Sequence, residues 1–167
     1  MLATPPETVR EVFKRSGSDA SCASWAIRYA ADLESVITVL SGMSTPEQME
    51  DNLSFMKGFR GLTQAERETL KEARKELMRI PLIPCTQCEY CAKVCPEQIG
   101  ISGTFQVMNM CTLYGKTERV VGELVWKVDK CGRKRAEACI QCGACEEACP
   151  QHIAIREELQ KAVNALG

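Results

Sequence analysis

Two cysteine-rich runs in the second half of the sequence constrain the fold more strongly than any other feature. Ten of the eleven cysteines lie between Cys85 and Cys149. The run from Cys85 to Ile101 aligns without gaps on the run from Cys139 to Ile155, at an offset of 54 residues (139 minus 85). Eight of the seventeen aligned positions are identical, and four of these are cysteines. An internal repeat of this kind predicts two copies of one local structure.

Each run has the spacing C-x₂-C-x₂-C-x₃-C-P, which is typical of bacterial ferredoxins with two [4Fe–4S] clusters. Three thiolates two residues apart in a tight loop can surround three iron corners of a cubane. The fourth cysteine begins a helix and points away from its own loop, so it is expected to bind the other cluster. The predicted ligands are Cys85, Cys88, Cys91 and Cys149 for one cluster, and Cys139, Cys142, Cys145 and Cys95 for the other.

Other uses of these cysteines fit the sequence less well. Structural zinc usually takes two C-x₂-C pairs, which would leave one cysteine of each loop without a role. An odd number of cysteines fits poorly with a disulfide framework. Haem attachment would need C-x-x-C-H, which does not occur in this sequence. A [3Fe–4S] cluster would be favoured by a missing thiolate, and no thiolate is missing from either run.

The remaining cysteines and the single histidine have simpler interpretations. Cys22 and Cys111 lie among apolar residues and are expected to pack in the core. Cys131 precedes a glycine at a helix end, and is expected to be a spare thiol or a substitute ligand. His152 is expected to face solvent or to cap a loop. The basic stretch from Arg133 to Arg135 is expected to be a solvated face, although it could also receive an acidic partner.

Charge and hydropathy exclude several classes of partner and location. The net charge of −1 gives no reason to expect nucleic acid or an anionic membrane as a partner. The longest apolar run, from Val36 to Leu40, is far too short to span a bilayer. The N-terminal residues lack the basic and apolar regions of a signal peptide. The expected location is therefore the cytoplasm, where thiols stay reduced.

The first eighty residues predict helices and a single strand. The segments Thr4–Glu7, Thr45–Gln48 and Thr63–Glu66 each place threonine three residues before glutamate or glutamine, which indicates a capping box. The first of the helices that follow is expected to end at about Lys14, and the last at about Met78. A further helix carries an apolar stripe at helical spacing, made of Cys22, Trp25, Ala26, Tyr29, Ala30 and Leu33.

A buried strand and a domain boundary complete the predicted organisation. The segment from Ser35 to Leu40 is short, rich in β-branched residues and followed by Ser-Gly, as expected of a buried strand. Pro81 and Pro84 bracket a linker that a helix cannot cross, which places a boundary between residues 1–80 and 81–167. Beyond it a helical insert from about 103 to 138 separates the cysteine runs. A last helix follows them, with its inner face formed by Ile155, Leu159, Ala162, Val163 and Leu166.

The sequence resembles the C-terminal part of an aldo/keto reductase that carries a dicluster ferredoxin-like domain. The stretch from Cys139 to Ile153, followed by an amphipathic helix, is similar to the tail of a group of bacterial and archaeal members of that family. Trp25–Arg28, Val36–Ser44 and Thr45–Asn52 resemble the seventh helix, the eighth strand and the eighth helix of the family's barrel. The resemblance covers essentially the whole chain. It implies a mainly α fold, in which a helical dicluster domain follows a truncated (β/α)₈-barrel remnant with a single strand.

This resemblance also implies what the chain lacks. The family's catalytic tyrosine, lysine, aspartate and histidine lie in earlier parts of the barrel, and no residue here maps onto them. Only the last of the eight strands is represented. The chain is therefore expected to be the C-terminal portion of a longer oxidoreductase, without catalytic activity of its own. Tyr29, Tyr90, Tyr114 and His152 are not expected to replace the missing groups.

A nucleotide site is implied by the resemblance alone. In this family the turn after the eighth strand and the N-terminus of the following helix hold the adenosine end of a nicotinamide cofactor. The matching residues are Gly42, Ser44, Thr45, Gln48, Asp51 and Asn52. Gly42 and Gln48 stand where members that prefer NADP carry lysine and arginine, so a 2′-phosphate would lack its charged partners. NAD(P) binding would be complete only in a full-length parent protein.

The expected function is electron transfer through two [4Fe–4S] clusters, in service of an oxidoreductase. The alternative is a stand-alone ferredoxin-like carrier or adaptor that docks on a separate oxidoreductase. A third interpretation makes the clusters structural or regulatory. The expected partner is a redox protein or a missing barrel domain, and a homodimer would be a further way to pair the lone strand.

Overall fold

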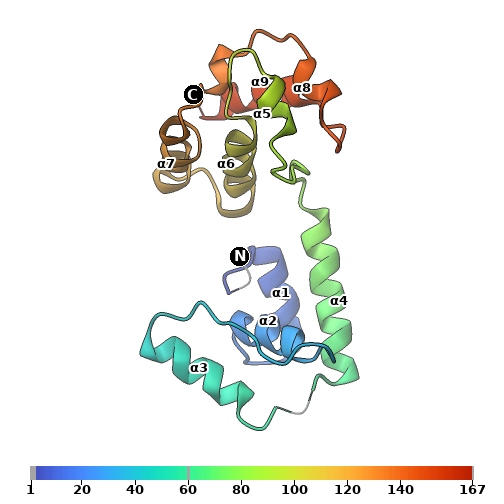
Figure 1. Ribbon diagram of the computed structural model, residues 1–167. Coiled ribbons are helices and arrows are strands. Elements are labelled where there is room, and N and C mark those ends of the chain that lie inside the picture. Colours follow the sequence, from blue (N-terminus) through green and yellow to red (C-terminus); the bar gives the residue numbers. More distant parts are fainter. Residues whose placement is uncertain (1–2, 60, 167) are drawn as a thin grey trace. The chain divides into compact units, whose positions relative to one another are not determined.

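A computed structural model describes residues 3–59 and 61–166 of the chain (Figure 1). The chain divides into two compact units, Met1–Arg79 and Ile80–Gly167, and each unit is described by itself. Among the described residues, helices and short turns account for all regular structure apart from one isolated bridge, Ile99 to Lys134. The expected mainly α fold is therefore confirmed. No helix in this part of the chain is both long and apolar enough to cross a lipid bilayer.

The first unit consists of four helices around a small core. The helices are α1 (Glu7–Arg15), α2 (Cys22–Ala31), α3 (Pro46–Met56) and α4 (Gln64–Arg79). The buried residues that form its hydrophobic core are Val9, Val12, Phe13, Trp25 and Ala73. The rings of Phe13 and Trp25 stack with their centroids 5.0 Å apart, which holds α1 against α2. α3 buries none of its residues, and Met49 and Leu53 remain exposed.

Two of the three predicted helix caps form. Thr45 Oγ1 accepts a hydrogen bond from the Gln48 backbone N–H at the start of α3. At the start of α4 the capping box is reciprocal, because Glu66 accepts from the Thr63 backbone N–H at 2.8 Å and Thr63 Oγ1 accepts from the Glu66 backbone N–H. The predicted cap at Thr4 is wrong, since α1 begins at Glu7 and Pro6 occupies the capping position without a side-chain hydrogen bond. Proline at that position has no side-chain acceptor to offer.

The predicted buried strand is also wrong. Residues 36–40 form no strand, and the side chains of Ile37 and Leu40 are 101% and 92% exposed. A β-branched run becomes a strand only when a neighbouring strand pairs with its backbone, and the described residues offer none. The apolar stripe of α2 is likewise only partly buried: Trp25 is enclosed, whereas Tyr29 and Leu33 are exposed.

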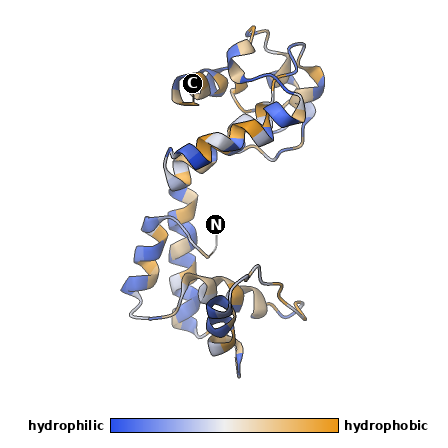
Figure 2. Cartoon of the chain, turned by 90° about the vertical axis from the view of Figure 1, so that its left-hand side faces the viewer, coloured by the Kyte–Doolittle hydropathy of each residue, from blue (hydrophilic) through white to orange (hydrophobic). Residues whose placement is uncertain are grey.

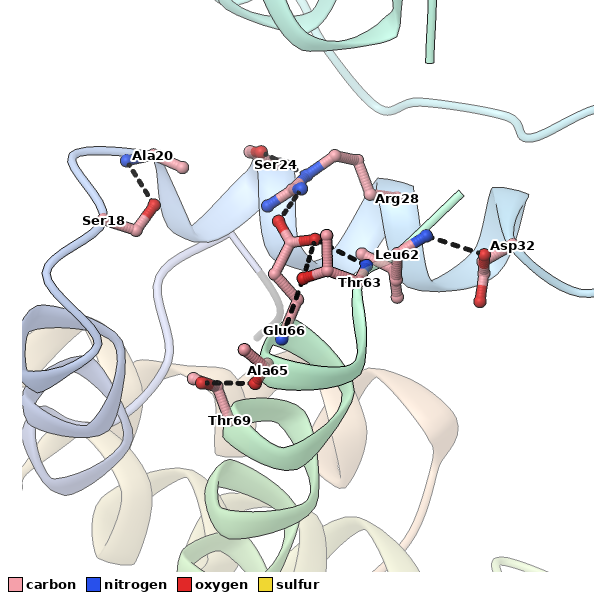
Figure 3. Close-up of polar contacts among 10 residues, drawn as sticks. All are labelled: Ser18, Ala20, Ser24, Arg28, Asp32, Leu62, Thr63, Ala65, Glu66 and Thr69. Carbon is pink, nitrogen blue, oxygen red and sulfur yellow. Dashed lines mark hydrogen bonds and ion pairs between the residues drawn. The ribbon is translucent and has the colours of Figure 1, made fainter. Parts of the chain in front are cut away.

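A polar network joins α2 to the start of α4 (Figure 3). The Arg28 guanidinium donates to the Glu66 carboxylate and, through Nε, to Ser24 Oγ at 3.0 Å. Asp32 Oδ1 accepts from the Leu62 backbone N–H at 2.9 Å. The same Glu66 carboxylate closes the capping box of α4, so one side chain fixes both the helix start and the neighbouring helix.

The second unit holds the cysteine runs around a larger core. Its helices are α5 (Tyr90–Val94), α6 (Ile101–Tyr114), α7 (Glu118–Lys127), α8 (Ala144–Glu147) and α9 (Ile155–Leu166). Two 3₁₀ turns, η1 (Asp129–Cys131) and η2 (Ala136–Ala138), lie between α7 and α8. α9 buries Ile155, Leu159, Ala162 and Leu166, in agreement with the expected inner face, while Val163 packs at its edge. Figure 2 shows hydrophobic and hydrophilic residues alternating along the helices, as expected of amphipathic helices.

Candidate iron–sulfur sites

The two cysteine runs adopt the same unusual backbone conformation. Gln87 and Glu89 in the first run have φ values of 60° and 63°, and their counterparts Gln141 and Gly143 have values of 60° and 87°. Gln98 and His152, which also lie 54 residues apart, repeat the pattern after each fourth cysteine. Left-handed residues turn the chain sharply, so each loop coils around its own three cysteines. Glu89 and Gly143 then cap the short helices α5 and α8.

Two cavities in this unit are each lined by four cysteines that come from both runs. One cavity contains Cys85, Cys88 and Cys91 of the first run together with Cys149 of the second. We call these four the Cys85 set. The other cavity contains Cys139, Cys142 and Cys145 together with Cys95. These four are the Cys139 set. The structure thus brings together the same two groups of four that the spacing predicts, with the fourth cysteine exchanged between runs.

The rest of the two linings is also related by the repeat. Pro150 and Ile153 line the Cys85 cavity, and their counterparts Pro96 and Ile99 line the Cys139 cavity. Phe105, from α6, corresponds in the same way to Leu159, from α9. Ile101 lines both cavities and is 1% exposed. The cavities are of similar size, as expected for two equal cofactors.

The chemistry of the donors fits an iron–sulfur cluster. Burial is the main cause that raises the pKa of Cys91 and of Cys145 to about 11, and neighbouring Cys85 and Glu89 contribute at Cys91. Burial also raises the pKa of Cys85. Because thiolates are the form that binds iron, loading these sites would release protons. No three His, Cys, Asp or Glu side chains of the described residues converge on a single-ion site. The cysteines instead surround the two larger cavities.

Several sulfur atoms also accept N–H hydrogen bonds. Cys139 Sγ accepts from Gln141 Nε2 at 3.4 Å, and Cys95 Sγ accepts from the Ile99 backbone N–H at 3.5 Å. The backbone N–H of Gln87 faces the Cys85 thiol and acts to lower its pKa. Hydrogen bonds of this kind stabilise the negative charge on ligand sulfurs.

The cysteines outside the two sets line neither cavity. Cys111 packs at the edge of the core of this unit, and Cys22 packs against the core of the first unit. Cys131 is exposed, and its thiol lies 3.5 Å from the Trp126 carbonyl oxygen. His152 is exposed and has a φ of 51°, in the turn after Cys149.

Charged residues beside the cavities were not identified by spacing alone. Glu89 lines the Cys85 cavity, and Arg156 lines the Cys139 cavity. Arg156 donates to the Glu146 carboxylate through its backbone N–H at 2.8 Å and through Nε at 2.9 Å. Hydrogen bonds from Arg156 lower the pKa of Glu146, so this carboxylate is charged at neutral pH. The sequence signal was present in the repeat, where Glu89 aligns with glycine and Arg156 with serine.

The residues matched to a nucleotide site lie on the surface of the first unit. They are Gly42, Ser44, Thr45, Gln48, Asp51 and Asn52, in the loop before α3 and its first turns. Gln48 Oε1 accepts from the Ser44 backbone N–H at 2.8 Å, and Asn52 Nδ2 donates to Ser41 Oγ at 2.9 Å. Asp51 is already engaged, because it accepts from Ser21 Oγ at 2.6 Å. Hydrogen bonds within the first unit therefore hold this segment at the N-terminal part of α3. Binding of a nucleotide there stays a prediction.

Comparison with protein families divides the chain at the same place as the structure. Residues 84–154 match the model of the 4Fe-4S dicluster domain, a region that contains all eight cysteines of the two sets. Residues 3–75 match the model of the aldo/keto reductase family. No curated protein and no solved structure matches the chain. The chain therefore carries a region that matches the aldo/keto reductase family model, followed by a region that matches the 4Fe-4S dicluster model.

Proposed function

We propose that the chain holds two [4Fe–4S] clusters, one in each four-cysteine cavity, and transfers electrons for an oxidoreductase. The observation that carries this proposal is the exchange of the fourth cysteine: Cys149 lies with the Cys85 loop and Cys95 with the Cys139 loop. A metal site built from the four cysteines of one run would not need a cysteine from the other run. When bound, such clusters supply reversible one-electron transfer.

The protein residues have separate roles at these sites. The eight cysteines supply the ligands, and the buried Ile99, Ile153 and Ile155 exclude water from the cavities. Ile101 borders both cavities and so lies between the two sites. Limited solvent access and hydrogen bonds to sulfur are the features by which a protein tunes such cofactors.

The first unit supports a proposal for the electron partner. The aldo/keto reductase region supports a parent or partner oxidoreductase with a barrel, in which NAD(P) would be held in part by residues 42–52. The exposed apolar segment at residues 36–40 is the surface on which a barrel strand, or a second copy of the chain, would pair. The alternative, a self-contained electron carrier, is favoured by one observation: the second unit holds both cysteine sets and has its own core.

Metal analysis and exchange of single ligands test the proposal together. Anaerobically prepared protein should contain about eight irons and about eight acid-labile sulfides per chain, as two cubanes require. The substitution Cys95→Ser should perturb the cluster of the Cys139 loop, and Cys149→Ser should perturb that of the Cys85 loop. Mössbauer and EPR spectra of each variant would report which cluster changes.

Cys131→Ser is the matched control, because Cys131 is exposed and lines neither cavity. It should leave iron, sulfide and spectra unchanged. Stoichiometric zinc without sulfide would contradict the cluster proposal altogether. Damage by Cys95→Ser to the cluster of its own loop would contradict only the exchanged ligand sets.

A further inference from the structure

Because of the internal repeat, the two cavities can be compared residue by residue. Most lining residues of one cavity have a counterpart 54 residues away in the lining of the other. Three of the four cysteine pairs match in exposure: Cys88 and Cys142 are exposed, Cys91 and Cys145 are buried, and Cys85 and Cys139 are half-buried. In the fourth pair Cys149 is buried and Cys95 is half-buried. Solvent access therefore distinguishes the two sites little, and differences in lining charge become decisive.

The charge of the lining residues differs at three positions of the repeat, one of which is Glu97 of the Cys139 cavity with its neutral counterpart Gln151. Glu89 lines the Cys85 cavity, where its counterpart in the other run is Gly143. Arg156 lines the Cys139 cavity, where its counterpart is Ser102. The Arg156 guanidinium lies against the loop of the Cys139 set, with its central carbon 3.8 Å from where a side chain on Gly143 would begin. Ser102, in contrast, offers only a hydroxyl, which donates to the Glu89 carboxylate.

Neighbouring charges do not cancel this difference. Glu146 neutralises Arg156, and Lys134 neutralises Glu97, the other charged residue in the lining of the Cys139 cavity. No cation of the described residues lies within ion-pair distance of Glu89. The exposed Lys93 and Glu147 line neither cavity. The Cys139 cavity is thus electrically balanced, whereas the Cys85 cavity carries one unmatched negative charge.

We infer that Glu89 and Arg156 make the two sites unequal, so that an electron settles at the Cys139 site in preference to the Cys85 site. This inference rests on the proposed two-cluster function. Reduction by an external one-electron donor adds one negative charge to a site. The Arg156 guanidinium stabilises that charge, and the Glu89 carboxylate opposes it. In the one-electron-reduced protein, occupancy of the Cys139 site should exceed that of the Cys85 site on the order of tenfold.

This inequality gives electron flow a direction. An electron that leaves the reduced Cys85 site and enters the oxidised Cys139 site moves to the more stable position. The two sites are separated by the shared side chain of Ile101. The Cys85 site is therefore assigned as the stronger reductant of the pair, and the Cys139 site as the place where electrons collect.

Exchange of residues between the repeats tests the inference. Redox titration with dithionite, followed by EPR, measures both midpoint potentials in wild type, Glu89→Gly and Arg156→Ser. Each variant installs the residue that the other run carries at the same position. Glu89→Gly should raise the lower potential only, and Arg156→Ser should lower the higher one only. The double variant should bring the two potentials together. Glu89→Gln, which removes the charge but keeps the size, should act like Glu89→Gly.

Glu157→Gln is the matched control, because Glu157 is the exposed neighbour of Arg156 and lines neither cavity. Its potentials should equal those of wild type. Iron and sulfide are measured on every sample, and a wild-type protein without two clusters would overturn the proposed function. Two intact clusters with equal potentials, or a shift of the higher potential in Glu89→Gln, would overturn the inference alone.

Discussion

Gly103 shows how single residues fix the core around the cavities. A Cβ atom at Gly103 would lie 2.4 Å from the Lys127 carbonyl oxygen, so only glycine lets α6 approach α7 this closely. A Cβ atom added at Gly122, in the middle of α7, would have no other atom within 4 Å. The two glycines therefore have opposite roles: one permits close packing, and the other only weakens a helix.

Alanine substitutions at these glycines should change stability in opposite directions. Gly103→Ala should destabilise the second unit by about 1–3 kcal/mol, because α7 must move away from α6. Gly122→Ala should stabilise it by about 0.5–1 kcal/mol, since alanine favours the helix. Thermal unfolding of the loaded protein, followed by circular dichroism, measures both. Equal effects of the two substitutions would show that the close approach does not matter.

Residue-level patterns predicted the candidate sites better than they predicted the first unit. Cysteine spacing depends on the local geometry of one cofactor and therefore needs little knowledge of the rest of the fold. Glu89 and Arg156 were missed because charge beside a cavity has no fixed spacing. Helical periodicity places Tyr29 on one face with Trp25 but does not show what covers that face, and in the structure Tyr29 is exposed.

At the scale of elements, helix caps depend on residues nearby in the sequence, whereas strands depend on partners from other parts of the chain. The cap of α4 was predicted from Thr63 and Glu66 because both partners lie within one turn. The cap of α1 failed because Pro6 moves the helix start past Thr4. The strand at residues 36–40 failed for a different reason: its hydrogen-bond partners would have to come from another strand, which sequence propensity cannot supply.

Glu66 should make the link between α2 and α4 dependent on pH. Burial acts to raise the pKa of Glu66, but hydrogen bonds from Arg28 and Thr63 outweigh it and leave the pKa below the ordinary value. A carboxylate with a lowered pKa stabilises the fold above its unfolded pKa, about 4.3. That contribution is lost as the pH falls through the lower pKa of the folded state.

The neutral variant Glu66→Gln should reveal this dependence. At pH 7 it should be less stable than wild type by about 1 kcal/mol, because a charged hydrogen bond is lost. The difference should shrink as the pH falls below the ordinary pKa, about 4.3, and disappear once the pH has passed through the lower pKa of the folded state. Urea unfolding followed by Trp25 fluorescence, in a Trp126→Phe background, isolates the first unit. A difference that is constant between pH 7 and pH 3 would exclude the ion pair as its cause.

At the scale of the whole molecule, the linker between the two units is tied to the second one. The Asn109 side chain accepts from the Ile83 backbone N–H at 2.8 Å and donates to the Ile83 carbonyl oxygen at 2.9 Å. Asn109 lies in α6, so this pair of hydrogen bonds anchors the chain just before Cys85. The residues from Ile80 to Leu82 precede the anchor and lie outside any helix.

Limited proteolysis should therefore separate the units at a defined place. A broad-specificity protease should cut the exposed residues 36–40 first, and then cut between Ile80 and Ile83. The surviving C-terminal fragment should stay brown, because it contains both cysteine sets and its core forms around them. Mass spectrometry gives the cleavage points, and visible absorption follows the clusters. In Asn109→Ala the cut should move beyond Ile83, since nothing then holds that residue against α6. Loss of colour in step with the first cleavage would mean that the clusters depend on the first unit, against the independence of the second unit.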